Sequence, residues 1–173
     1  MSRSPIRTAL KQLQTDGLIV TDHYKSLYVK EITDQDIHEI YQLRELIETA
    51  AFRYIFDTNM QTDFSYRLEE KVVRMCAAAN DPYEWELADT EMHMTIVGAL
   101  NNSRITKVYE NTLDELIRIG QVSVKFGMHI EETNSNLKKL VSYMRENDFE
   151  NAFAILKNDH FTIGKESALK REE

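Results

Sequence analysis

Apolar side chains recur at three- and four-residue steps through most of the chain after residue 32, a period typical of amphipathic α-helices. Only five glycines and two prolines occur among the 173 residues, so few positions force a helix to end. The pattern predicts six helices, at about residues 36–56, 62–79, 82–100, 103–126, 132–146 and 149–170. We therefore expect an all-α fold in which these helices form a six-helix antiparallel bundle.

The first eighteen residues predict a further, shorter helix. Ser4 is a suitable N-cap, Pro5 suits the first helical position, and Gly17 suits the left-handed residue that ends a helix. Three basic residues share one side of this helix: Arg3, Arg7 and Lys11. Arginine reads base edges and phosphates favour helix N-termini, so this helix, with Ser4, suits contact with a DNA major groove. The simpler interpretation is a solvated helix with scattered basic residues.

Residues 18–32 predict a two-stranded β-hairpin, because apolar residues alternate on both sides of a polar centre. Lys25 lies near the predicted tip and would reach a DNA phosphate, although a solvated turn explains it equally well. The chain is thus expected to have two parts. Residues 1–31 would form a partial DNA-binding module, and residues 32–173 a helical domain.

Charge is distributed unevenly between these two parts. The chain has a net charge of −8, which excludes a protein that coats nucleic acid. Residues 1–30 hold five lysines and arginines against two aspartates, so they carry +3 and the remainder carries −11. A basic module attached to an acidic domain fits a protein whose first part alone contacts DNA.

Cys76 is the single cysteine, so it cannot form an internal disulfide, and its apolar surroundings predict a small buried residue. No apolar run is long enough for a membrane span, and no signal peptide is evident. We expect a cytoplasmic protein.

Asp89 and His93 lie four residues apart on a predicted helix, so both side chains project the same way. A carboxylate and an imidazole at this spacing form a common half-site for a divalent cation. An ordinary Asp–His hydrogen bond on a helix surface is the simpler alternative. The apolar residues around the pair favour the buried side of the helix, where a charged pair needs a partner or a metal.

Arg44 allows two interpretations. It would pair with Glu48 one turn away, or point into a pocket and bind a carboxylate with its guanidinium fork. The chain lacks the paired Glu-x-x-His motifs of helical-bundle metalloenzymes, and it has neither a Ser/His/Asp set nor a glycine-rich phosphate loop. We therefore predict no catalytic residues and no enzyme activity.

Residues 2–19, SRSPIRTALKQLQTDGLI, resemble the recognition-helix signature of GntR-type transcription regulators. Thr8 departs from that signature, which usually has Glu. The family also has two helices before this one, so residues 1–31 resemble the second half of a winged helix-turn-helix. The resemblance implies contact with double-stranded operator DNA and a homodimer.

The helical part resembles the FCD domain, the effector-sensing half of FadR-type GntR regulators. The matching stretches are IYQLRELIETAA, ELADTEMHMTIVGALNNSRI and YMRENDFENAFAILKNDH. Asp89, His93 and Asn102 fall at matching spacing. The resemblance implies a small carboxylate effector and a divalent metal such as Zn, Ni or Mn.

Further histidines complete the metal site in that family, and here the correspondence is incomplete. Leu137 stands at one of these positions, with Asn136 beside it. The other position falls on Asp159 by count, with His160 next, and His160 lies on the apolar stripe of its helix. The predicted metal ligands are Asp89, His93 and His160. The predicted effector contacts are Arg44, Asn102, Asn136 and Asp159.

Two forms of the site stay open: a weak metal site, or a metal-free pocket that binds the effector directly. The function expected from the sequence is a ligand-responsive, DNA-binding transcription regulator that senses a small organic acid. The alternative is a truncated sensing and dimerisation module that does not bind DNA by itself; a helical-bundle metalloenzyme is disfavoured.

Overall fold

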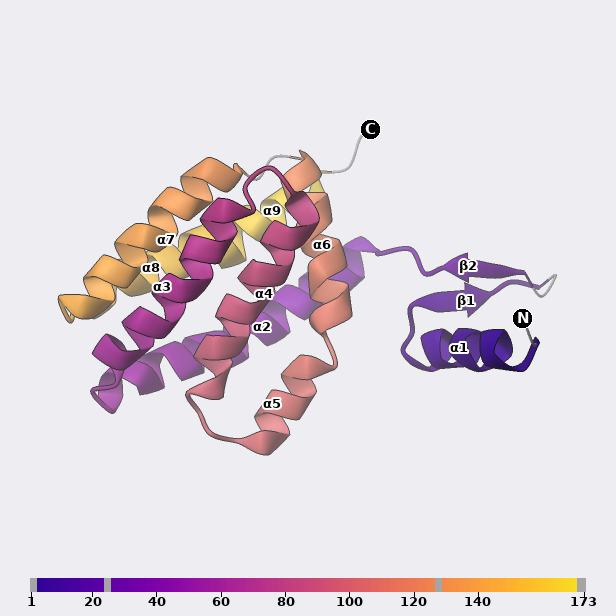
Figure 1. The fold of residues 1–173 in the computed structure, drawn as a ribbon, viewed down its shortest axis with the longest axis horizontal. Helices are drawn as coiled ribbons and strands as arrows, with labels where there is room; N and C mark the ends of the chain where they lie inside the picture. Colours follow the sequence, from indigo (N-terminus) through magenta and orange to yellow (C-terminus); the bar gives the residue numbers. More distant parts are fainter. Residues whose placement is uncertain (1–2, 24–25, 127–128, 171–173) are drawn as a thin grey trace. The chain divides into compact units, whose positions relative to one another are not determined.

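The computed structural model describes residues 3–23, 26–126 and 129–170, and only the backbone of Arg3 and Ser4 (Figure 1). It divides into two compact units, Met1–Thr33 and Asp34–Glu173. The predicted class is confirmed: the chain is mostly helical, with one small two-stranded antiparallel sheet. In the part that is described, no helix is both long and apolar enough to cross a membrane.

The first unit contains one helix and the predicted hairpin. Helix α1 spans Arg3–Thr15, and strands β1 (Ile19–Thr21) and β2 (Leu27–Val29) pair antiparallel, with Val20 opposite Tyr28. Gly17 ends α1 with a φ of +74°, as its position predicted. Ser4 lies inside the first turn of α1, so its predicted position as the N-cap is wrong. The helix begins two residues earlier than the cap pattern indicated.

Over residues 34–126 and 129–170, the second unit contains helices and no strand. Its elements are α2 (Asp34–Asp57), α3 (Gln61–Ala77), α4 (Pro82–Gly98), α5 (Ser103–Glu110), α6 (Leu113–Phe126), α7 (Ile130–Arg145), α8 (Phe149–Ile155), η1 (Leu156–Ile163) and α9 (Gly164–Leu169). Helix α3 packs against α4 and α7, whereas α6 packs against α4 and α9 (Figure 1). Helix α2 packs against α4, η1 and α9, so α4 lies between α2 and α6.

Local chemistry explains how α4 begins and where several helices end. Asp81 caps α4 by accepting hydrogen bonds from the backbone N–H groups of Tyr83 and Glu84, and Pro82 occupies the first helical position. Three asparagines adopt positive φ in the turns after helices: Asn59, Asn101 and Asn147. Asparagine tolerates this conformation better than most residues, so these turns are encoded without glycine.

The fourth predicted helix, residues 103–126, is in fact two helices. Helix α5 ends at Glu110 and α6 starts at Leu113, with Asn111 and Thr112 between them. The Thr112 hydroxyl donates to the Tyr109 carbonyl (2.7 Å), so a side-chain donor satisfies a backbone carbonyl at the end of α5. Asparagine and threonine favour such bonds between side chain and backbone, but they also occur inside helices, and the sequence pattern did not reveal the break.

The sixth predicted helix is one continuous helical run that changes its winding. Residues 149–155 and 164–169 are α-helical, whereas Leu156–Ile163 form the π-helix η1. The Thr162 hydroxyl donates to the carbonyl of Lys157, five residues earlier (3.2 Å). Such wide turns are rare and occur frequently at functional sites.

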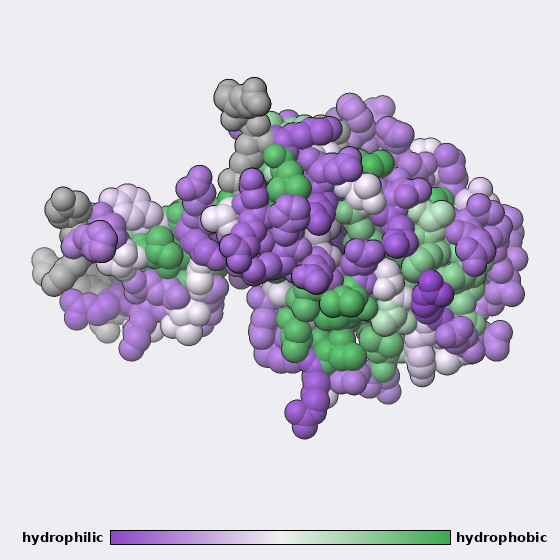
Figure 2. Space-filling view, turned by 180° about the vertical axis from the view of Figure 1, so that it is seen from behind, coloured by the Kyte–Doolittle hydropathy of each residue, from purple (hydrophilic) through white to green (hydrophobic). Residues whose placement is uncertain are grey.

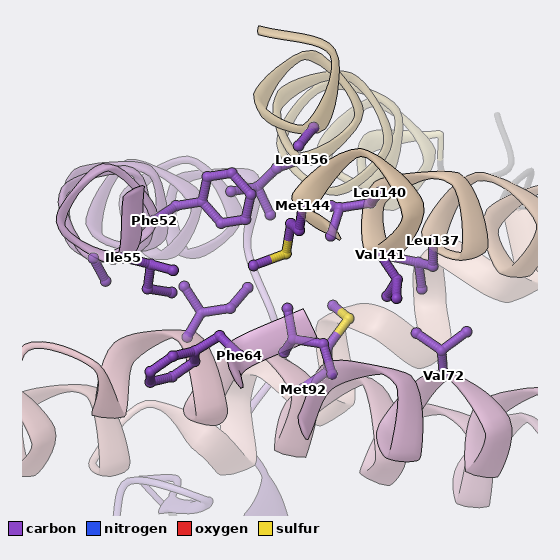
Figure 3. Close-up of a cluster of buried hydrophobic side chains, with 14 of the residues drawn as sticks. Phe52, Ile55, Phe64, Val72, Met92, Leu137, Leu140, Val141, Met144 and Leu156 are labelled. Atoms are coloured by element: carbon purple, nitrogen blue, oxygen red, sulfur yellow. The ribbon is translucent and has the colours of Figure 1, made fainter. Parts of the chain in front are cut away.

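The hydrophobic core lies between α2, α3, α4, α7 and α8 (Figure 3). Phe52 and Ile55 of α2 face Met144 and Leu140 of α7 across this core, and Leu156 covers it from the last helical run. Cys76 is only half-buried at the core's edge, so the prediction of a buried cysteine is wrong. The core fixes α4 between its neighbours, and α4 carries the residues described next.

Candidate metal and effector site

Three side chains from two elements converge in the interior of the helical unit. Asp89 and His93 lie one turn apart on α4, and His160 lies on η1. His93 Nε2 is 3.2 Å from His160 Nδ1 and 3.4 Å from an oxygen of Asp89, and His160 Nδ1 is 3.6 Å from the other Asp89 oxygen. All three residues are buried. The structure therefore brings together the three residues that the sequence proposed as metal ligands.

Glu48 of α2 contacts the His93 ring at Nδ1, the nitrogen that does not face Asp89 and His160. Its Oε2 atom contacts His93 Nδ1, while its Oε1 atom accepts hydrogen bonds from Arg44 Nε (2.9 Å) and the Tyr109 hydroxyl (2.6 Å). Burial opposes ionisation of Glu48, but Arg44 and His93 outweigh it and hold the pKa of this carboxyl well below its ordinary value. A carboxylate on the far nitrogen of an imidazole fixes the ring and leaves Nε2 free for a metal.

The two imidazoles differ in protonation. Burial disfavours charge on His93, yet Glu48 and Asp89 raise its pKa above the ordinary value. Burial lowers the pKa of His160 to about 3, so this ring is neutral near pH 7. Asp89 stays ionised, because His93 and His160 lower its pKa against the effect of burial. A neutral imidazole and a carboxylate are ready ligands for a divalent cation.

The cluster lines a cavity with a free volume of about 20 Å³, room for roughly one water molecule or one ion. Other groups that reach the cavity are Tyr41, Arg44, Glu86, Tyr109 and Gly120. Among the described residues, Arg44 Nη2, Asp89 Oδ1 and His160 Nε2 are buried without a hydrogen-bond partner. Unpartnered buried polar atoms around a small cavity indicate a site that takes a ligand.

The donor set fits a divalent transition metal. In a tetrahedral site with metal–ligand bonds near 2.1 Å, ligand atoms lie about 3.4 Å apart. His93 Nε2 and His160 Nδ1 are 3.2 Å apart, and each lies close to this distance from one Asp89 oxygen, His93 at 3.4 Å from Oδ2 and His160 at 3.6 Å from Oδ1. Two imidazoles and one carboxylate suit zinc, nickel or manganese better than calcium or magnesium.

Arg44 makes the predicted pair with Glu48, while its binding of a carboxylate ligand stays a prediction. It also lines the cavity with its Nη2 atom unpartnered. Its guanidinium lies near two rings, 5.3 Å from the centre of Tyr41 and 5.9 Å from that of Phe161. The Arg44 guanidinium is therefore held in position before any ligand binds.

Three of the predicted effector contacts do not line this cavity. Asn102 is exposed and caps α5, accepting from the backbone N–H groups of Arg104 and Ile105. Asn136 and Asp159 interact with each other instead, and burial raises the pKa of Asp159. These three residues therefore lie outside the lining of this cavity, and their role as effector contacts stays a prediction.

The predicted DNA contacts belong to the first unit. Arg7 and Lys11 are exposed on α1, and Arg3 and Ser4 lie in its first turn. Lys25 lies outside the described residues.

Sequence reasoning missed several residues that line the cavity or support its histidines. Glu48 was considered only as a partner of Arg44, and Tyr41, Tyr109 and Glu86 were given no role. Glu86 precedes Asp89 by one helical turn, so the spacing of α4 contained a signal for it. Tyr109 and Glu48 meet across 61 positions of sequence, which no local pattern reveals.

Comparisons with known proteins agree with this architecture. Residues 39–160 match the FCD domain family. A gluconate operon transcriptional repressor of Bacillus licheniformis is 32% identical over 114 residues, which cover 64% of this chain and 46% of that protein. The chain thus spans about half the length of that relative.

Solved structures share the fold. A transcriptional regulator GntR from Rhodococcus sp. RHA1 has a TM-score of 0.78 at 18% identity, covering 100% of this chain and 83% of the other. The metal-free FCD domain of TM0439 has a TM-score of 0.67 at 19% identity, covering 82% of this chain and 96% of the other. The chain therefore belongs to the FCD-domain family.

Proposed function

We propose that the protein is an effector-controlled, DNA-binding transcription regulator and not an enzyme. The observation that carries this proposal is the buried Asp89–His93–His160 cluster beside Arg44, in a domain of the FCD family. A ligand in this cavity would contact α2, α4 and η1 at once. It would then favour one arrangement of these helices over another, which is how an effector shifts a two-state protein.

The effector is proposed to be a small carboxylate. Arg44 offers an unpartnered, pre-positioned guanidinium nitrogen next to the cluster. The relative named as a gluconate operon repressor makes sugar acids the first compounds to titrate into the protein by calorimetry. Because the cavity is only about 20 Å³, an organic acid must displace side chains when it binds, and this displacement would be the signal.

Asp89, His93 and His160 are proposed to hold one divalent metal ion. When bound, such an ion would act as a Lewis acid with open positions for a carboxylate oxygen. Glu48 keeps His93 oriented toward the ion, and Arg44 balances the charge of an anionic effector. The alternative without metal uses the same cavity, with the two imidazoles and Arg44 binding the anion directly.

Mutation of His93 tests the metal centre. Protein exposed to Zn²⁺ and then desalted is expected to retain about one equivalent by elemental analysis. His93→Gln should retain none, because it removes the central ligand. The control is His129→Gln, which alters an exposed histidine at the start of α7. If the unmodified protein and the His93→Gln variant retained equal amounts of zinc, the proposed metal centre would be overturned.

The DNA-reading role is proposed for α1 of the first unit, with Arg3, Ser4, Arg7 and Lys11 as contacts, together with Lys25. The alternative is a sensing module without DNA binding of its own. An exposed hydrophobic area on the helical unit (Figure 2) supports the homodimer that two-fold operators require, because such areas mark interaction surfaces.

Selection from a pool of random DNA duplexes distinguishes these alternatives. The regulator should enrich particular sequences, and Arg7→Ala should weaken their binding by at least about fivefold, the equivalent of roughly 1 kcal/mol. Arg104→Ala, an exposed arginine on α5, should change nothing. No enrichment by the protein itself would favour the sensing module.

A further inference from the structure

Glu86 is a buried carboxyl in the cavity for which the site described above has no use. It lies on α4 at 3% exposure, three residues before Asp89 and seven before His93. Positions i, i+3 and i+7 of a helix share one face. Glu86, Asp89 and His93 therefore form a single stripe, and all three line the cavity.

The Glu86 carboxyl has no hydrogen-bond partner among the residues that the structure describes. Its electrostatic neighbours include Asp89, which repels its charge, and also Arg44 and Tyr41. Glu48, the other acidic residue near the cluster, is fully engaged by Arg44, Tyr109 and His93. The carboxyl of a buried residue that lines a cavity beside another carboxylate is a candidate to bind a cation.

Glycine at position 120 provides the space in which this carboxyl lies. A Cβ atom at Gly120 would stand 1.9 Å from Glu86 Oε2 and 2.6 Å from Oε1. Any other residue at position 120 would push the Glu86 carboxyl away. The carboxyl thus has room to rest against α6, at the edge of the cavity that Asp89, His93 and His160 also line.

We infer that Glu86 is a further ligand of the metal centre, moving from Gly120 to join Asp89, His93 and His160 when the ion binds. This inference rests on the proposed metal site. A divalent transition ion takes four or more ligands, and the cluster supplies three. Glu86 is the unengaged donor that lies on the same helical stripe, and its flexible side chain allows the movement.

Zinc affinity tests the inference. Binding of Zn²⁺ to the metal-free protein is measured by competition with a chromophoric chelator, for the protein and for Glu86→Gln. The substitution keeps the volume and removes the anionic ligand, so affinity should fall at least about tenfold. Glu84→Gln is the matched control, because Glu84 is an exposed glutamate on the same helix. Its affinity should equal that of the protein.

Cobalt provides a readout that a merely space-filling role would not change. The visible absorption of Co²⁺-loaded protein depends on its ligands, so Glu86→Gln should alter the spectrum and Glu84→Gln should not. Unchanged zinc affinity and an unchanged cobalt spectrum in Glu86→Gln would overturn the inference while leaving the three-residue centre intact. A protein that binds no zinc at all would overturn the centre, and Glu86 as its ligand with it.

Discussion

Replacing Glu48 with glutamine is expected to lower the free energy of unfolding of the metal-free protein by roughly 3–5 kcal/mol. The carboxylate is wholly buried and contacts Arg44, His93 and Tyr109. Removing its charge leaves the buried guanidinium of Arg44 uncompensated, which is far more costly than losing an exposed ion pair. Urea unfolding followed by circular dichroism measures the change.

Two further variants make this result specific. Glu45→Gln, on the same helix, removes an ion pair with Lys157 in which both side chains are about half exposed, so it should cost less than about 1 kcal/mol. The double variant Arg44→Met/Glu48→Leu removes both buried charges and should be more stable than Glu48→Gln alone. If Glu48→Gln were no less stable than Glu45→Gln, the buried network would not contribute as described.

The difference in free energy of unfolding between the protein and His160→Gln is expected to depend strongly on pH. Burial lowers the pKa of His160 to about 3 from 6.5, so the unfolded chain takes up a proton below pH 6.5 that the folded chain refuses. Its contribution to stability is therefore complete above pH 6.5 and is lost as the pH falls. Between pH 4.5 and 6.5, the stability difference between the two proteins should rise by up to about 1.4 kcal/mol per pH unit.

Glu86→Gln should give a slope of opposite sign. Burial and the charge of Asp89 raise the pKa of Glu86 well above its ordinary value. The folded chain thus keeps a proton that the unfolded chain releases above about pH 4.5, and stability falls as the pH rises. Urea titrations of metal-free samples at several pH values measure both slopes. Slopes of the same sign in the two comparisons would contradict the assignment of the two groups.

Local periodicity was sufficient to predict most of the helical framework. The start of α4 followed from Pro82, and the ends of α2 and α7 fell within a few residues of the prediction. The break between α5 and α6 was not predictable, because Asn111 and Thr112 are compatible with a helix interior. A tertiary contact sets the position of the break, since Tyr109 donates a hydrogen bond to Glu48 just before it.

The candidate site was predictable where a local pattern or the family resemblance pointed to its residues. Asp89 and His93 were identified from their spacing on one helix, and His160 from its place next to the family's ligand position and on the apolar stripe of its helix. Glu48 is joined to His93 across 45 positions of sequence, and only the packing of α2 on α4 reveals this contact. Asn102 does not line the cavity: an asparagine just before a helix that starts with serine is also typical of an N-cap, and in the structure Asn102 caps α5.

The wide turn η1 has a consequence for comparing sequences. A π-helical segment contains one more residue than an α-helix of the same span. The helix before and after the segment keeps its packing, but the residues within the segment are shifted by one position relative to those of a regular α-helix. Counting along the chain assigns the ligand position of the last helix to Asp159, yet His160 is the side chain that reaches Asp89 and His93. A search for this site in other sequences should therefore accept a histidine one place later than fixed spacing requires.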